Sequence, residues 1–306
     1  MNSQSNAMTP APGAQAVSPA HIPAMRQFYS SVERELWESR SIYIAPLAVA
    51  GLFLFGFLIN AMHLPQTLSS AFGPAELHDL IEQPYDMVAL LIMGVSFVVA
   101  VFYCLDALYG ERRDRSILFW KSLPVSDTTA VLSKTSIPVV VLPLLTVAIT
   151  VATHVAMLLV SSAVLLGSGM SAGALWSHLP LSHMWQMLFF HLVGGHGMWY
   201  APIYAWLLLV SAWARRAPLL WAVLPPLAIG AVEKIAFNTS HFAAILQHRI
   251  MGDPSVRGST TGISIDAMTP FTPGQLLGSP SLWIGLAIAT AFLAAAVRLR
   301  RHGGPI

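Results

Sequence analysis

Residues 136–166 read "SIPVVVLPLLTVAITVATHVAMLLVSSAVLL", a run without a single charged side chain. The charge-free stretch is longer still, because no Asp, Glu, Lys or Arg occurs from Thr135 to Ala214. A helix needs about 20 apolar residues to cross a bilayer, so this stretch has room for two crossings. It predicts a polytopic membrane protein and not a soluble domain.

The composition of the whole chain supports the same class. Of its 306 residues, 55% are hydrophobic and only 10% are charged, whereas soluble domains carry about 25% charged residues. The mean hydropathy is +0.64. The single cysteine, Cys104, lies in an apolar run, which excludes a disulfide within the chain and a cysteine-based metal site.

These patterns predict an all-α polytopic membrane protein with one transmembrane domain, residues 24–301. An amphipathic elbow helix is expected over 24–40, since its apolar side chains recur at helical spacing. Residues 1–23 lack the apolar core of a signal peptide and are expected to be a disordered tail, with a second short tail at 302–306. Six membrane spans are expected near 42–62, 87–108, 136–166, 185–213, 217–237 and 281–299.

The distribution of Lys and Arg predicts the orientation. With both termini on one face, that face receives thirteen of these residues and the opposite face three. The first loop of the opposite face, residues 63–86, has four acids and no Lys or Arg. Because Lys and Arg accumulate on the cytoplasmic side, both termini are expected there, and 238–280 becomes the longest outer segment.

One charged segment interrupts the apolar pattern between the second and third expected spans. Residues 110–127 contain "GERRDRSILFWKSLPVSD", and the part before Pro124 reads as a short helix. Its exposed apolar side chains, flanked by bases, fit two interpretations equally well. The helix either lies among lipid headgroups or docks into a groove of a soluble partner, with the charges fixing its orientation.

The stretch "GERRDRSILFWKSLPVSDTTAVLSK" resembles the segment between spans two and three in permeases of type-2 ATP-binding-cassette (ABC) exporters. That segment has a charged Glu-Arg turn, a short helix, Pro-Val/Ile-Ser and a downstream Lys. Here Glu111-Arg112, Pro124-Val125-Ser126 and Lys134 match it, while Arg115-Ser116 replaces the usual Gly-Thr. The elbow helix, six spans and large outer segment are similar as well, so that the resemblance covers about residues 25 to 301.

The resemblance implies that residues 111–123 form the coupling helix, which docks on a separate ATPase subunit. The residues expected at this contact are Glu111, Arg112, Arg113, Arg115, Leu118, Phe119, Trp120, Lys121 and Leu123. It also implies a second permease subunit, identical or homologous, in a bacterial inner membrane. None of the three lysines lies in a phosphate-binding loop, so ATP and magnesium are expected on the partner and no cofactor, catalytic residue or nucleic acid on this chain.

Two groups of residues near the expected outer face carry further hypotheses. Glu233 and Lys234 lie close to the end of the fifth span, and they are a candidate outer gate. A set of histidines, including His191 and His196, raises a metal site as an alternative, although their spacing of five places them about 140° apart on a helix. The alternatives to a permease are therefore an intramembrane histidine–metal enzyme and a non-transporting membrane scaffold that recruits a cytoplasmic partner.

Overall fold

The computed structural model describes residues 23–66, 74–122, 125–169, 171, 173, 176, 179, 181–251 and 277–304. Within these residues the chain is helical and forms no strand, as the sequence predicts. Several expected segments lie wholly or partly outside the described part. These are residues 1–22 of the N-terminal tail, 123 and 124 of the coupling segment, 252–276 of the outer segment, and 305 and 306 of the C-terminal tail.

The described helices lie along the chain in the following order. They are α1 (Ala24–Glu38), α2 (Ser41–Ala61), α4 (Pro74–Ala107), α5 (Tyr109–Arg113), α6 (Ser116–Ser122), α7 (Asp127–Ser136), η1 (Ile137–Val141), α8 (Leu142–Gly167), α10 (Leu181–Phe190), η2 (His191–Trp199), α11 (Ala201–Trp213), α12 (Pro218–Phe237), α13 (His241–Met251) and α16 (Pro280–His302). The two η segments are π-helical turns.

Five helical stretches are long and apolar enough to cross a membrane, in agreement with an integral membrane protein. These stretches are Ser41–Ala61, Leu80–Arg113, Asp127–Gly167, Pro218–Phe237 and Pro280–His302. The fourth expected span, 185–213, is divided among α10, η2 and α11, and α11 alone has only 13 residues. The count of six spans therefore stays a prediction.

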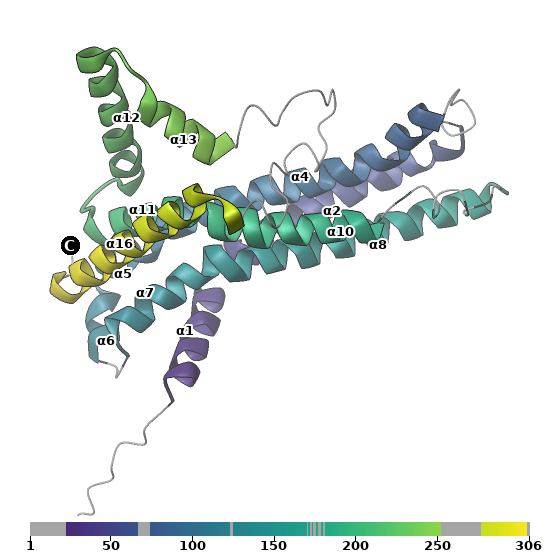
Figure 1. Cartoon of the computed structure of the whole chain (residues 1–306). Helices are drawn as coiled ribbons and strands as arrows, with labels where there is room; N and C mark the ends of the chain where they lie inside the picture. Colours follow the sequence, from purple (N-terminus) through teal and green to yellow (C-terminus); the bar gives the residue numbers. More distant parts are fainter. Residues whose placement is uncertain are drawn as a thin grey trace, which may run out of the picture.

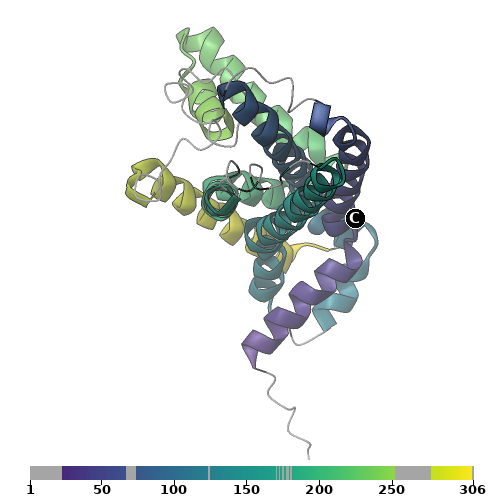
Figure 2. The ribbon, with the colours of Figure 1, turned by 90° about the vertical axis from the view of Figure 1, so that its right-hand side faces the viewer.

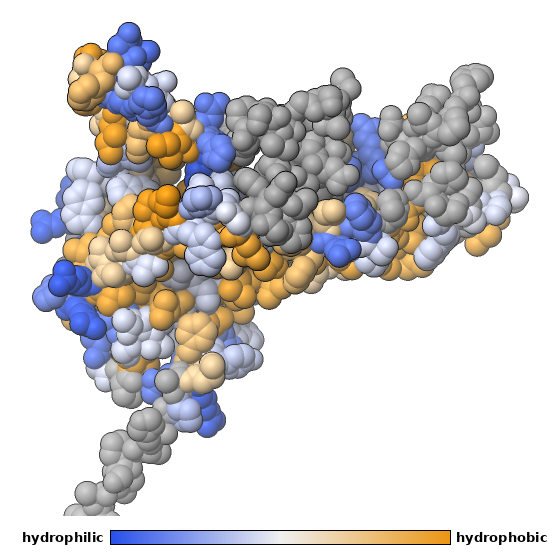
Figure 3. Space-filling model, viewed as in Figure 1, coloured by the Kyte–Doolittle hydropathy of each residue, from blue (hydrophilic) through white to orange (hydrophobic). Residues whose placement is uncertain are grey.

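Helices α2, α4 and α8 run side by side along the length of the molecule, and α11 packs against α16 (Figure 1; the bundle is seen nearly end-on in Figure 2). Their contact surfaces bury two groups of apolar side chains, one around Cys104, Tyr204 and Leu208 and the other around Ile92 and Met157. The outward faces are also apolar: Leu52 of α2 is 73% exposed and Phe102 of α4 is 60% exposed. Figure 3 shows these apolar surfaces along the long helices. Such faces fit a bilayer and not water.

The third membrane-length stretch contains a π-helical turn at one of the two prolines that favour a kink there. Pro138 lies in η1, where the missing backbone donor is accommodated by the wider turn. This turn packs on η2, and a Cβ atom at Gly197 would lie 2.6 Å from the carbonyl oxygen of Val139. Gly197 thus permits the two backbones to approach each other.

The α12–α13 hairpin leaves the bundle. Ala217 and Asn238, which bracket α12, both have left-handed backbone conformations, with φ of 48° and 50°. Figure 1 shows α12 running across the direction of the long helices. Of the α12 side chains only Ala222 is buried, so that this membrane-length helix packs little against the rest of the described chain.

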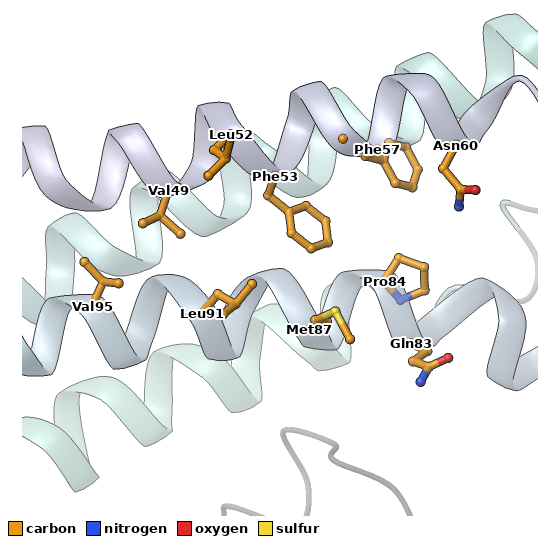
Figure 4. A pocket seen from close by; sticks show the side chains of 11 residues that line it. Val49, Leu52, Phe53, Phe57, Asn60, Gln83, Pro84, Met87, Leu91 and Val95 are labelled. Carbon is orange, nitrogen blue, oxygen red and sulfur yellow. The ribbon is translucent and has the colours of Figure 1, made fainter.

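An apolar groove of about 660 Å³ lies between α2 and α4. Figure 4 shows Phe53 and Phe57 on one wall and Met87 and Leu91 on the other, with an amide side chain from each helix, Asn60 and Gln83, at one end. The groove opens sideways from the bundle, so lipid chains would face it in a bilayer.

Candidate functional site

The charged segment 110–122 forms two short helices joined by a tight turn. Helix α5 ends at Arg113 and α6 begins at Ser116. Arg115, within the turn, has a φ of 59°, which is the left-handed region that glycine adopts most readily. The backbone of Arg115 therefore has a conformation that a glycine would favour.

Helix α6 presents two large apolar side chains outward. Leu118 is 58% exposed and Phe119 is 59% exposed, whereas Ile117 between them and the turn is buried. Ile117 thus holds the helix to the body while its two neighbours project. Two exposed apolar side chains side by side on a short polar-flanked helix suit either a membrane interface or a binding surface.

Trp120 connects α6 to the elbow helix α1. The guanidinium carbon of Arg34 lies 3.4 Å from the centre of the Trp120 ring, a stacked cation–π contact. The Phe119 and Trp120 rings also meet edge to face, with their centres 5.0 Å apart. Trp120, expected as a docking anchor, is therefore half-buried under Arg34, and Phe119 is the more accessible of the two rings.

Beneath α5 lies a network of buried charged residues from four helices. Lys134 of α7 lies 2.8 Å from an oxygen of Glu35 in α1 and 3.2 Å from an oxygen of Glu111 in α5. Arg300 of α16 approaches the second oxygen of Glu111 at 3.0 Å and Asp127 at 3.8 Å. We call these five residues the ion network. Charges removed from water are tolerated only when they are paired, and here each acid faces a base.

The electrostatics of Glu35 show how tightly the network is paired. Burial alone raises the pKa of a carboxyl group, but the adjacent Lys134 ammonium attracts the carboxylate and donates a hydrogen bond to it. The hydroxyl of Tyr103 donates a second hydrogen bond, at 2.9 Å. Together these attractive contacts outweigh the effect of burial and lower the pKa of Glu35 below its ordinary value, so the carboxylate is ionised at neutral pH.

Two further contacts hold α5 to the C-terminal end of α11. Arg112 donates to the carbonyl oxygens of Ala212 and Ala214 at the end of α11, and Ser211 Oγ accepts from the backbone nitrogens of Leu108 and Tyr109. The Arg112 side chain thereby satisfies carbonyls that the end of a helix leaves unpaired. It is directed into the body of the protein and not toward a partner.

Lys121 joins α6 to the C-terminal end of α16. Its ammonium donates to the carbonyl oxygens of Arg301, at 3.3 Å, and of Gly303, at 2.8 Å. A positive charge is favourable at this position, because the last carbonyls of a helix carry partial negative charge.

The predicted docking residues therefore divide into three groups. Arg113, Arg115, Leu118, Phe119 and Lys121 are exposed, Trp120 and Arg112 are half-buried in contacts with α1 and α11, and Glu111 is buried; Leu123 lies outside the described residues. The sequence interpretation missed Glu35, Tyr103, Lys134 and Arg300 as parts of this site. The available signal was the rarity of charge, since each charged residue close to an apolar span needs a partner.

The candidate outer gate has a structural contact of its own. The carboxylate of Glu233 accepts hydrogen bonds from the backbone nitrogens of His241 and Phe242, at 2.7 and 2.8 Å, and from the hydroxyl of Thr239. Glu233 thus caps the first turn of α13, where the helix leaves its amide groups unpaired. Lys234, the next residue, is exposed.

The histidines of the described residues are held in local contacts. His154 receives a hydrogen bond from Trp185 and lies 3.0 Å from the carbonyl oxygen of Tyr85, and the rings of His191 and His196 meet edge to face. No group of three His, Cys, Asp or Glu side chains that could hold a metal ion occurs in the part of the chain that the structure describes. The histidine–metal alternative thus has no assembled site among these residues.

Comparison with known proteins adds no relative: no protein-family model, no curated protein and no solved structure matches this chain.

Proposed function

We propose that this chain is the permease subunit of an ATP-binding-cassette exporter in a bacterial inner membrane, and that α6 docks on a separate ATPase subunit. The observation that carries the proposal is the pairing of exposed Leu118 and Phe119 on α6, a helix that buried Ile117 anchors and that directly follows α5, whose Glu111 is held by ion pairs. A helix that docks on a partner and transmits force has to be both accessible to that partner and rigidly held. The end of the bundle that bears α5, α6, the start of α7 and the C-terminal end of α16, here called the basic end, is then cytoplasmic.

The chemistry of the cycle belongs to the partner in this proposal. The sequence has no phosphate-binding loop, so ATP and magnesium would be held by the ATPase subunit. Closure of an ATPase dimer would displace α6 on each of two permease subunits. The ion network would carry that displacement from α5 to α1, α7 and α16, because the charges of Glu111, Lys134 and Arg300 are costly to separate once buried.

The test is purification of the chain from its native membrane in mild detergent, followed by assay of ATP hydrolysis sensitive to vanadate. Phe119→Glu places a charge on the exposed apolar surface and should remove the co-purifying ATPase activity. Thr128→Glu adds the same charge to an exposed position at the start of α7 and serves as the matched control. Equal retention of ATPase activity by both variants would rule out docking through α6, and absence of any ATPase from the wild-type preparation would contradict the permease assignment.

A further inference from the structure

The docking helix and the C-terminal end of the last helix form one continuous surface. Two independent contacts join them: Arg300 reaches Glu111 beneath α5, and Lys121 of α6 donates to the carbonyls of Arg301 and Gly303. The contact between Arg300 and Glu111 is buried, whereas the contact of Lys121 is exposed. The C-terminal end of α16 is therefore held both beneath the segment 110–122 and at its surface. Neither contact follows from the resemblance, which places docking only in the segment between spans two and three.

The charges on this surface indicate what it would bind. Arg298 and Arg301, in the last turns of α16, are exposed, and among the described residues neither has a carboxylate within ion-pair distance. Arg115 is also exposed, at the other end of α6 from Lys121. Leu118 and Phe119 thus have basic side chains around them. The complementary surface is an apolar pocket with carboxylates on its rim, as charge pairing across an interface sets orientation.

The position of α6 favours a soluble protein over a lipid surface as the occupant. The exposed Met25, Tyr29 and Trp37 of α1 suit an elbow helix lying in the membrane interface. In Figure 1, α6 and the C-terminal end of α16 lie farther along the bundle axis than α1, on the side away from the long helices. With α1 at the level of the headgroups, α6 and the end of α16 project beyond them.

We propose that the docking surface is composite, made of α6 and residues 298–304 at the end of α16, and that it binds an apolar, acid-rimmed pocket of the ATPase subunit. Lys121 is the positioning residue that joins its two halves directly, and Arg300 positions the end of α16 through Glu111 of α5, the helix that precedes α6. This inference rests on the proposed function and extends it, because ATPase closure would then act on the last membrane-length helix directly and not only through α5.

The experiment is site-specific photo-crosslinking in native membranes with full-length chain. A photoreactive phenylalanine analogue replaces Phe119, Arg301 or, as a control on the exposed part of α1, Arg26. Crosslinked products are identified by mass spectrometry. The expected result is one and the same ATP-hydrolysing subunit crosslinked from positions 119 and 301, and not from position 26. Adding Lys121→Met should reduce the product from position 301 about fivefold while that from 119 persists, since an exposed charge-assisted hydrogen bond is lost.

The remaining outcomes separate the two proposals. An ATPase crosslinked from position 119 alone would overturn the composite surface and leave the proposed function standing. Lipid crosslinked from both positions would assign the whole surface to the membrane and overturn both proposals, as would two products of which neither hydrolyses ATP. An unchanged product from position 301 in Lys121→Met would remove Lys121 from its positioning role. Because Lys121 is exposed, this variant is expected to fold.

Discussion

The ion network at the basic end and the α12–α13 hairpin both use charged side chains, but over very different ranges of sequence. In the network, Glu35 pairs with Lys134, 99 residues away, and elsewhere at the basic end Lys121 donates to Gly303, 182 residues away. In the hairpin, Glu233 binds groups only six to nine residues ahead of it. The basic end is therefore held together as a unit, whereas the hairpin fixes mainly its own turn.

The difference indicates which region of the fold can transmit motion and which region can move independently. Paired charges in a low-dielectric site resist separation, so α1, α5, α7 and α16 should move together. Helix α12 packs little on the described chain and leaves the bundle at Ala217. Near its start α12 contacts α11, where Trp206 Nε1 donates to the carbonyl oxygen of Ala222 and the Trp213 and Trp221 rings meet edge to face. The hairpin also returns to the bundle through α13, where the Arg249 guanidinium carbon lies 4.4 Å from the centre of the Trp199 ring.

The largest effect is expected from Lys134→Met. The change leaves Glu35 and Glu111 buried without their shared base, which should lower the free energy of unfolding by about 3–5 kcal/mol. Chemical unfolding in detergent measures the loss. The double variant that also has Glu35→Gln should regain part of it, because Glu111 still faces Arg300 and no buried carboxylate is then left without a base. A loss below 1 kcal/mol would mean that the network does not hold the basic end together.

Acid should weaken the same contacts. A carboxyl group whose pKa is lowered by folding adds stability above its ordinary pKa, and that stability is lost as the pH falls through the lowered value. For Glu35 the ordinary value is 4.5, so the loss should begin below pH 4.5 and continue to lower pH. Measuring the free energy of unfolding against pH for the wild type and for Glu35→Gln isolates the contribution of Glu35. Identical profiles for the two proteins would argue against the paired Glu35.

Arg249→Met tests the long-range contact of the hairpin. The variant loses the cation–π contact with Trp199 and the hydrogen bonds to Ser281, at an expected cost of about 1 kcal/mol. Thermal unfolding and tryptophan fluorescence report the change. Trp199→Phe keeps an aromatic face for Arg249 but loses the hydrogen bond from Trp199 Nε1 to the carbonyl oxygen of Arg249, and thereby measures that bond separately. A cost as large as that of Lys134→Met would erase the contrast between the two regions.

Arg115→Gly should be neutral or slightly stabilising, by about 0.5 kcal/mol. The substitution relieves the left-handed backbone at φ 59°, and the gain is partly offset by the greater freedom of glycine in the unfolded chain. Arg113→Gly, at the end of α5, provides the control and should destabilise. If Arg115→Gly destabilised the protein as much, the turn between α5 and α6 would differ from the one described.

Glu233→Ala should have the smallest effect on overall stability, because its hydrogen bonds are confined to the α12–α13 turn. Hydrogen exchange should quicken at His241 and Phe242, whose amides lose their acceptor, and remain unchanged at the basic end. Lys234→Ala, the neighbouring exposed position, should leave exchange unaltered. A change in exchange within α5 or α6 would instead connect the hairpin to the docking site.

The sequence predicts the parts of this fold that depend on local pattern. Apolar runs locate the membrane-length helices, and Pro138 marks the irregular turn in one of them, since both signals lie within a few residues. The ion network could not be predicted in the same way. Glu35 lies among the polar residues of an amphipathic helix and is nevertheless buried, because helix packing turns that side of α1 toward Lys134.

The charged segment 110–122 shows the same limit of prediction from the sequence, within a few residues. Its place in the chain and its helix before Pro124 were evident, but the inward direction of Glu111 and Arg112 depends on the ends of α11 and α16. The direction in which α12 leaves the bundle could not be predicted from the sequence either. Its apolar composition predicts a span, whereas its direction is set by the left-handed Ala217, a residue with no local signal for that conformation.

The most direct test of the proposed function is native mass spectrometry of the chain purified from its own membrane. The account predicts a complex of two permease subunits, identical or homologous, with two ATPase subunits, which releases the ATPases when Phe119→Glu is introduced. A chain that leaves the membrane alone, or with partners that bind no nucleotide, would contradict it.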